Sequence, residues 1–173
     1  MNQPLVLHIV RFLIAFLIQV LILNQIEIGF GIQLMVYPLF ILLLPIDMNV
    51  FYLMIIAFGT GGMIDIFSNT YGLHASSLLV FAYFRPIIFN LFAPRDGYDI
   101  LLETNVFNMG SSWFIRAFGL LLIIHHLWYF LLEMFKLSEI LYILQKTGMS
   151  VVLSFVLCIL FQYLFLRKPS KEK

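Results

Sequence analysis

The chain has 173 residues, of which 62% are hydrophobic and only 11% are charged, and its mean hydropathy is +1.02. Ordinary soluble domains carry about 25% charged residues, so this composition excludes a soluble globular fold and indicates a protein that lies in a membrane. The formal net charge of +1 provides no electrostatic basis for a nucleic-acid partner.

Six apolar runs follow one another along the chain, and each is expected to form a membrane-spanning helix. Crossing about 30 Å of hydrocarbon takes about 20 helical residues. The expected spans are Pro4–Leu23, Phe30–Leu44, Val50–Phe67, Leu73–Phe92, Trp113–Leu132 and Met149–Leu166. The runs are apolar on all sides instead of alternating, which argues against the strands of an outer-membrane barrel. These features predict an all-α integral membrane protein, a compact bundle of about six transmembrane helices that forms a single domain over residues 1–173.

The second run, Phe30–Leu44, is the weakest of the six. It is short for a span, and it is bounded or interrupted by Gly31, Gln33, Pro38 and Pro45. A proline inside a membrane helix frees a carbonyl group that neighbouring helices or water must satisfy, so Pro38 predicts a position packed within protein. This run could tilt, kink or re-enter the membrane on one side. A bundle of five spans, which would reverse the side of the N-terminus, is the alternative.

The end of the third run carries small residues and an acid. Gly59, Gly61 and Gly62 predict a packing surface, because small side chains let helices approach closely in lipid. Asp65 lies near the outer end of the same run, where a carboxylate is costly unless it finds a polar partner. We expect it to bond to the turn that follows and to the N-terminus of the next helix, with His74 as a hydrogen-bond partner. Contact with another protein, and a proton or ion site, are the alternatives.

Arg85 and Pro86 lie toward the end of the fourth run. The long arginine side chain is expected to reach the cytoplasmic interface, and the proline is expected to bend the last turn or to begin an interfacial segment. A functional contact of Arg85 is the alternative. In the loop Ala93–Ser112, turn residues flank Tyr98–Phe107, whose apolar side chains are expected to rest on the inner membrane surface.

His125 and His126 in the fifth run suggest a metal site, but adjacent helical residues project about 100° apart and cannot both ligate one ion from the same face. Intervals of three and four place a stripe of residues on one side of this helix: Arg116, Gly119, Ile123, His126, Phe130 and Glu133. His126 and Glu133 are therefore expected to face other helices and to form interhelical hydrogen bonds. Metal binding or proton transfer at His126 is the alternative. The chain carries neither a nucleophile motif nor a phosphate-binding glycine loop, so we expect no enzymatic activity, no metal and no cofactor.

The basic residues predict the orientation of the bundle. With six spans, one side collects Arg11, Arg85, Arg95, Arg116, Arg167, Lys168, Lys171 and Lys173, and the other side holds Lys136 and Lys146. Cytoplasmic loops carry an excess of lysine and arginine. Both termini are therefore expected in the cytoplasm.

Several of these residues together resemble a known family. They are the small residues before Asp65, then Phe67, a polar turn, Gly72-Leu73-His74 and a helix ending in Arg85-Pro86. Other parts agree: Pro38 with Leu44-Pro45, the run Trp113-Phe114-Ile115-Arg116, and His125-His126 followed by Phe130 and Glu133. The pattern, which covers most of the chain, resembles the rod shape-determining membrane protein family MreD, in the form found in Bacteroidetes-like bacteria.

The resemblance implies a non-catalytic scaffold of the bacterial inner membrane, in the elongasome that directs peptidoglycan synthesis and maintains cell shape. It implies binding to the bitopic protein MreC, beside MreB and the elongation glycosyltransferase and transpeptidase, within the lipid bilayer. The candidate packing or partner contacts are Gly59, Gly61, Gly62, Asp65, Gly72, His74, Arg85, Arg116, His126 and Glu133.

The alternative function is that of a small-molecule-binding membrane subunit or transporter. Six short-looped helices also describe the substrate-capture subunits of energy-coupling-factor transporters, to which the MreD family is distantly similar in fold. Such a protein needs a polar cavity that faces outward. The short outer loops and the few polar groups in the expected spans do not favour one.

Overall fold

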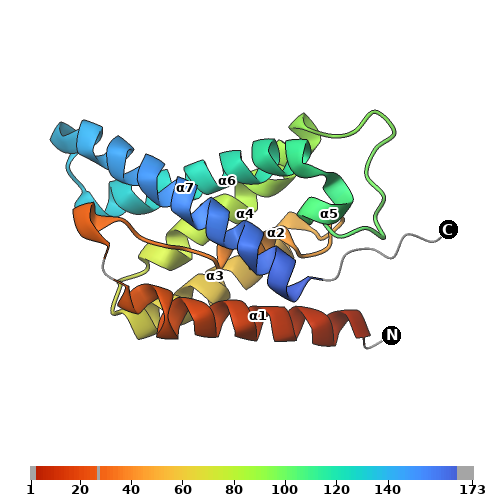
Figure 1. Cartoon of the computed structure of the whole chain (residues 1–173), viewed down its shortest axis with the longest axis horizontal. Coiled ribbons are helices and arrows are strands. Elements are labelled where there is room, and N and C mark those ends of the chain that lie inside the picture. Colours follow the sequence, from red (N-terminus) through yellow and green to blue (C-terminus); the bar gives the residue numbers. More distant parts are fainter. Residues whose placement is uncertain (1–2, 27, 167–173) are drawn as a thin grey trace.

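The structure is a computed structural model that describes residues 3–26 and 28–166, and this part of the chain is helical apart from its connections (Figure 1). The helices are α1 (Gln3–Leu21), α2 (Pro38–Leu42), α3 (Val50–Ser68), α4 (Leu73–Leu91), α5 (Val106–Met109), α6 (Ser111–Met134) and α7 (Ile140–Phe165), with the short 3₁₀ helices η1 (Leu23–Gln25), η2 (Gly29–Gly31) and η3 (Leu137–Glu139). Four segments of the described chain are long and apolar enough to cross a membrane: Val6–Gln25, Val50–Ser68, Ser111–Met134 and Ile140–Phe165. The chain is therefore an all-α, multi-pass membrane protein.

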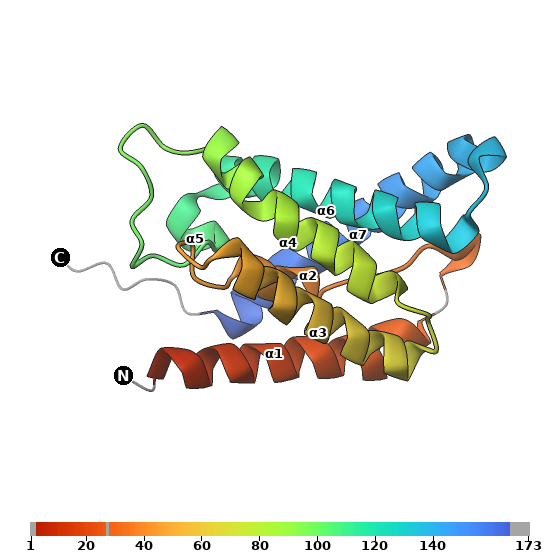
Figure 2. The same ribbon diagram turned by 180° about the vertical axis from the view of Figure 1, so that it is seen from behind.

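The helices run back and forth between two ends of the bundle (Figures 1 and 2). The helix α3 packs on α4, α4 on α6 and α6 on α7, while α1 lies against α3. The start of α1 and the end of α7 lie at one end, together with residues 43–49 and 92–110, and we call this the terminal end. The opposite end, which we call the turn end, holds residues 22–26 and 28–33 and the connections 69–72 and 135–139. The described chain thus enters and leaves the bundle at the same end.

The second apolar run is not a full-length helix, so the expectation of a helical span over Phe30–Leu44 is wrong. Residues 32–36 run as an extended chain, Tyr37 takes helical φ and ψ angles of -62° and -26°, and the helix α2 that follows has only five residues. Phe30 and Gly31 take φ angles of 64° and 67°, which break helical geometry, and Pro38 lacks an N–H group and begins α2. The segment still passes from the turn end toward the terminal end (Figure 1).

Side chains of neighbouring helices replace the missing helical hydrogen bonds of this extended segment. The amide of Gln19 on α1 accepts from the N–H of residue 36 and donates to the carbonyl of residue 34, both at 2.8 Å. The hydroxyls of Ser150 and Ser154 on α7 accept from the N–H groups of residues 33 and 35 at 3.1 and 2.9 Å. Backbone outside a helix is tolerated at membrane depth only where protein or water satisfies it. Gln19, Ser150 and Ser154 therefore make the extended conformation possible.

The loop of residues 92–110 is fastened to the terminal end of the bundle. The hydroxyl of Tyr98 donates to a carbonyl near the end of α4 at 2.7 Å and accepts from Nε1 of Trp113 at 2.9 Å. Partial burial raises the pKa of this Tyr98 hydroxyl. Arg11 on α1 holds Glu103 through two hydrogen bonds of 2.8 and 3.1 Å. The apolar tip, residues 100–102, stays exposed, which fits the expected contact with the membrane surface.

Candidate functional site

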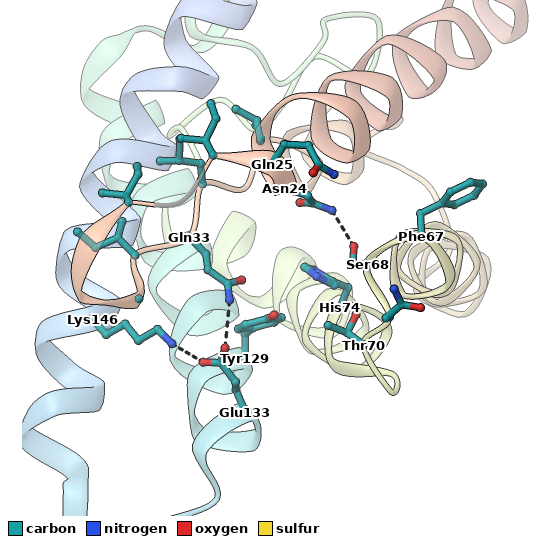
Figure 3. A pocket seen from close by; sticks show the side chains of 17 residues that line it. Asn24, Gln25, Gln33, Phe67, Ser68, Thr70, His74, Tyr129, Glu133 and Lys146 are labelled. Atoms are coloured by element: carbon teal, nitrogen blue, oxygen red, sulfur yellow. Dashed lines mark hydrogen bonds and ion pairs between the residues drawn. The ribbon is translucent and has the colours of Figure 1, made fainter.

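A cavity of about 570 Å³ opens at the turn end of the bundle (Figure 3). It lies between the segment that contains η1 and η2, the turn from α3 to α4, the last turns of α6 and the first turns of α7. Its polar lining residues are Asn24, Gln25, Gln33, Ser68, Asn69, Thr70, His74, Tyr129, Glu133 and Lys146. Concave sites in which a few polar groups converge are where small ligands bind. This cavity is therefore the candidate functional site.

One wall of the cavity carries an ion pair. Lys146 on α7 is only 7% exposed, and its Nζ lies 2.5 Å from Oε2 of Glu133 on α6 and 4.5 Å from the ring centre of Phe130. The other carboxylate oxygen of Glu133 accepts from Nε2 of Gln33 at 3.1 Å (Figure 3). A buried ammonium group needs a charged or hydrogen-bonding partner. The pair therefore balances its own charge and joins α6, α7 and the extended segment.

The opposite wall is built from amide and hydroxyl groups. Asn24, which follows α1, donates through Nδ2 to the hydroxyl of Ser68 at the end of α3, at 2.7 Å (Figure 3). Asn24 in turn accepts at 2.8 Å from the Gln19 amide that also holds the extended segment. This wall is thus continuous with the polar groups that fix the segment of residues 32–37.

His74 and Tyr129 lie side by side in the lining, with ring centres 4.9 Å apart. Nδ1 of His74 lies 2.8 Å from the hydroxyl of Tyr37, which lies 3.0 Å from Nε2 of His125. A hydroxyl has one hydrogen and can accept two hydrogen bonds, so at least one of the two imidazoles donates to Tyr37. Within the described part of the chain, Nε2 of His74 has no hydrogen-bond partner. One ring nitrogen of His74, a residue of the cavity lining, is therefore without a partner in this part of the chain.

A polar stripe on α7 supplies Lys146 to the cavity and was not expected from the sequence. It consists of residues spaced by four, all of them buried: Lys146, Ser150, Ser154, Cys158 and Gln162. The expected span begins at Met149, which leaves Lys146 in the preceding loop, whereas α7 begins at Ile140 and includes Lys146. Residues four apart are neighbours on one face of a helix. This spacing of polar residues in an otherwise apolar run is the sequence signal that could have predicted the stripe.

Asp65 caps the N-terminus of α4, as the sequence predicts. Its Oδ1 accepts from the hydroxyl of Thr70 at 2.5 Å and from the backbone N–H of His74 at 3.0 Å, and its Oδ2 accepts from the N–H of Ala75 at 2.8 Å. The expected partner His74 thus contributes its backbone, while its ring turns to Tyr37. A carboxylate at this position satisfies N–H groups that a helix leaves free and complements the helix dipole. Gly72, with φ of 84°, provides the left-handed residue just before α4.

The three glycines of α3 occupy different surroundings. A Cβ atom on Gly61 would lie 2.5 Å from Cα of Ala75, so α3 and α4 are in backbone contact at this point. Gly59 and Gly62 have nothing within 4 Å of the corresponding position among the described residues. Only Gly61 of these three is therefore required for packing within the described bundle.

Arg85 turns inward, and the expectation that its side chain reaches the interface is wrong. It is 1% exposed, and its guanidinium group donates to the carbonyls of Leu42, Leu44 and Pro45 at 3.0, 2.5 and 3.3 Å. The same group lies 4.6 Å from the ring centre of Phe89. The last carbonyl groups of a helix are free and carry partial negative charge. Arg85, on α4, therefore satisfies the free carbonyl groups at the C-terminal end of α2 and just after it.

His126 forms the interhelical hydrogen bond that the sequence predicts. Its Nδ1 lies 2.9 Å from the carbonyl of Leu122 and its Nε2 lies 3.1 Å from the hydroxyl of Ser154 on α7. A carbonyl only accepts, so Nδ1 carries the proton and Nε2 accepts from Ser154 in the neutral ring. Arg116, expected on the same stripe, is exposed and donates to the carbonyl of Ser112 at 3.1 Å. His126 thus links α6 to the residue that holds the extended segment.

No group of three or more His, Cys, Asp or Glu side chains in the described ranges is placed to hold a metal ion. Comparisons of the chain with models of protein families, with curated proteins and with solved structures found no match.

Proposed function

We propose that this chain is a non-catalytic scaffold of the bacterial inner membrane, of the MreD type, that binds MreC and helps to maintain cell shape. In this proposal MreB and the elongation glycosyltransferase and transpeptidase belong to the same complex, and both termini lie in the cytoplasm. The resemblance of the segment from Gly59 to His74 and of the later motifs supports it. The observation that carries it is an apolar groove on the side of the bundle formed by α6 and α7.

The groove has a volume of about 550 Å³ and lies between α6 and α7. It is lined by Phe92, Ile115, Arg116, Gly119, Leu120, Ile123, Val151, Val152, Phe155 and Val156. A Cβ atom on Gly119 would meet nothing nearer than a carbon of Phe155 at 4.0 Å, so Gly119 leaves room in it. Helices associate in lipid by close packing on small residues, because lipid provides no hydrophobic drive between them. The single transmembrane helix of a bitopic protein such as MreC suits this groove.

The test fills the groove without disturbing the bundle. Gly119→Leu places a large side chain in the groove, and we expect at least about a tenfold loss of MreC binding, which corresponds to about 1.4 kcal/mol. The matched control is Gly148→Leu on α7, an exposed position outside the groove where the same change meets open space. Co-purification of MreC and the shape of cells that carry each variant are measured. Undiminished MreC binding by the Gly119→Leu protein at a normal level would contradict the proposal.

The second candidate function is small-molecule binding, and the cavity at the turn end favours it. The expectation that the spans hold few polar groups does not apply to α7, whose polar stripe reaches the cavity. With both termini in the cytoplasm, the turn end faces outward, as a substrate-capture subunit requires. Equilibrium dialysis of the purified protein against labelled water-soluble vitamins, beside a pull-down with MreC, separates the two candidates.

A further inference from the structure

We propose that the cavity at the turn end binds an uncharged ligand rich in hydroxyl and amide groups, of the chemical class of an N-acylated sugar. The proposal rests on the second candidate function and adds the class of ligand to it. It is compatible with a scaffold as well, because the cavity uses Tyr129, Glu133 and Lys146, whereas the groove uses other parts of α6 and α7.

Among the described lining residues, the charged side chains are paired with each other and leave no free partner for an ionic ligand. Lys146 and Glu133 are the charged side chains among the described lining residues, and each has the other as its partner at 2.5 Å. A phosphate or carboxylate ligand needs a cation that is not already paired, and an ammonium ligand needs a free carboxylate. Burial of an unpaired charge costs several kcal/mol. A ligand without net charge leaves the pair intact.

The neutral polar groups of the lining match a ligand that both donates and accepts hydrogen bonds. The amides of Asn24, Gln25, Gln33 and Asn69 do both, and so do the hydroxyls of the lining. The free Nε2 of His74 adds a further polar atom. Hydroxyl and amide groups of a sugar match this mixture, whereas a hydrocarbon would leave it unsatisfied. The volume of about 570 Å³ lies within the range of about 300–1,000 Å³ typical of small-molecule sites.

The ligand class is tested with three probes that share one ring and differ in charge: N-acetylglucosamine, which is neutral, glucosamine, which is a cation, and glucuronate, which is an anion. Binding to the full-length protein in lipid nanodiscs is measured by saturation-transfer NMR. We expect N-acetylglucosamine to bind at least about tenfold more tightly than either charged probe.

Two variants and a matched control locate the binding. Gln33→Leu and Tyr129→Phe each remove one polar group from the lining at nearly constant volume, and each is expected to weaken N-acetylglucosamine binding about threefold to tenfold. The control is Gln145→Leu, the same change at an exposed position beside Lys146 that does not line the cavity. It is expected to bind like the unaltered protein. Equal binding by all three variants would overturn the assignment to this cavity.

A charge change tests the reason for the selectivity. Glu133→Gln leaves Lys146 without its anionic partner, so the preference is expected to move toward glucuronate. If the unaltered protein prefers a charged probe, the ligand class is wrong while small-molecule binding stands. If none of the three probes binds, the ligand class is overturned, and the vitamin dialysis alone then decides the second candidate. MreC binding is independent of both outcomes.

Discussion

Gly61 shows how much depends on a single missing side chain. The approach of α3 to α4 at Gly61 places the first turn of α4 against α3, where Asp65 caps it. Gly62 is the next residue and meets nothing within the described chain. Two neighbouring glycines of one motif therefore have different roles in the bundle.

We expect Gly61→Ala to destabilise the protein by about 1–3 kcal/mol, because the added carbon clashes with backbone that cannot move aside. Gly62→Ala is the matched control. It is expected to be neutral or to stabilise, since alanine favours a helix over glycine by about 1 kcal/mol. Thermal unfolding of the detergent-solubilised variants measures both. Equal stability of the two variants would contradict the close contact of α3 and α4.

The hydrogen bonds of His126 predict which substitutions it tolerates. His126→Gln keeps an amide group that can bond to the hydroxyl of Ser154, so we expect stability and cell shape to remain largely unchanged. His126→Leu leaves buried polar groups unpaired and is expected to cost about 1–3 kcal/mol. Unfolding temperature and cell shape are the measurements. If glutamine fails as completely as leucine at a normal protein level and with normal MreC binding, proton or metal chemistry at His126 becomes the better explanation.

Among the elements, α2 and the extended segment before it depend most on their neighbours. The segment is held by Gln19 from α1 and by Ser150 and Ser154 from α7, and the end of α2 is held by Arg85 from α4. The hydroxyl of Thr104 also donates to the carbonyl of residue 42. An element of five residues is too short to be stable alone, so its position is set by these contacts.

We expect Arg85→Met to destabilise the protein by about 3 kcal/mol, because unsatisfied buried polar groups cost about 1–3 kcal/mol each. The stability of Arg85→Lys is expected to lie between those of Arg85→Met and the unaltered protein, since one ammonium group cannot reach the same set of carbonyls as the guanidinium group of arginine. The control is Arg116→Met, which changes an exposed arginine. Unfolding is followed in increasing concentrations of a denaturing detergent. A stability of Arg85→Met equal to that of Arg116→Met would rule out this role.

For the whole molecule, the distribution of charge along the bundle predicts the orientation. Arg11 and Arg85 contact groups of the terminal end, and Lys136 and Lys146 lie toward the turn end. Four further basic residues of the expected cytoplasmic side lie outside the described residues: Arg167, Lys168, Lys171 and Lys173. Under the positive-inside rule the terminal end lies in the cytoplasm.

We expect reporter fusions at Lys173 and at Lys136 to report opposite sides of the membrane, with Lys173 in the cytoplasm. Fusions at Gln25 and Met48 test the second run separately, because Gln25 precedes this run at the turn end and Met48 follows it in the connection at the terminal end. Met48 should report the same side as Lys173, and Gln25 the opposite side. A periplasmic signal at Lys173 would overturn the orientation, and a signal at Gln25 on the same side as Met48 would support the bundle of five spans.

The sequence by itself determined the features that depend on composition and on near neighbours. The excess of apolar residues predicted a membrane protein, and the length of the runs predicted an all-α bundle. The Asp65 cap could be predicted as well, because its partners lie within ten residues of it. Such features require no knowledge of how distant segments meet.

Only the tertiary structure decided the conformation of the second run, the direction of Arg85 and the existence of the cavity. Gln33 meets Glu133 and residue 35 meets Ser154 across separations of 100 and 119 positions in the chain. In a membrane, backbone and charged groups take the conformation in which protein satisfies them. Since those partners come from helices that are distant in sequence, local patterns predict the cost of each polar group but not the place where it is satisfied.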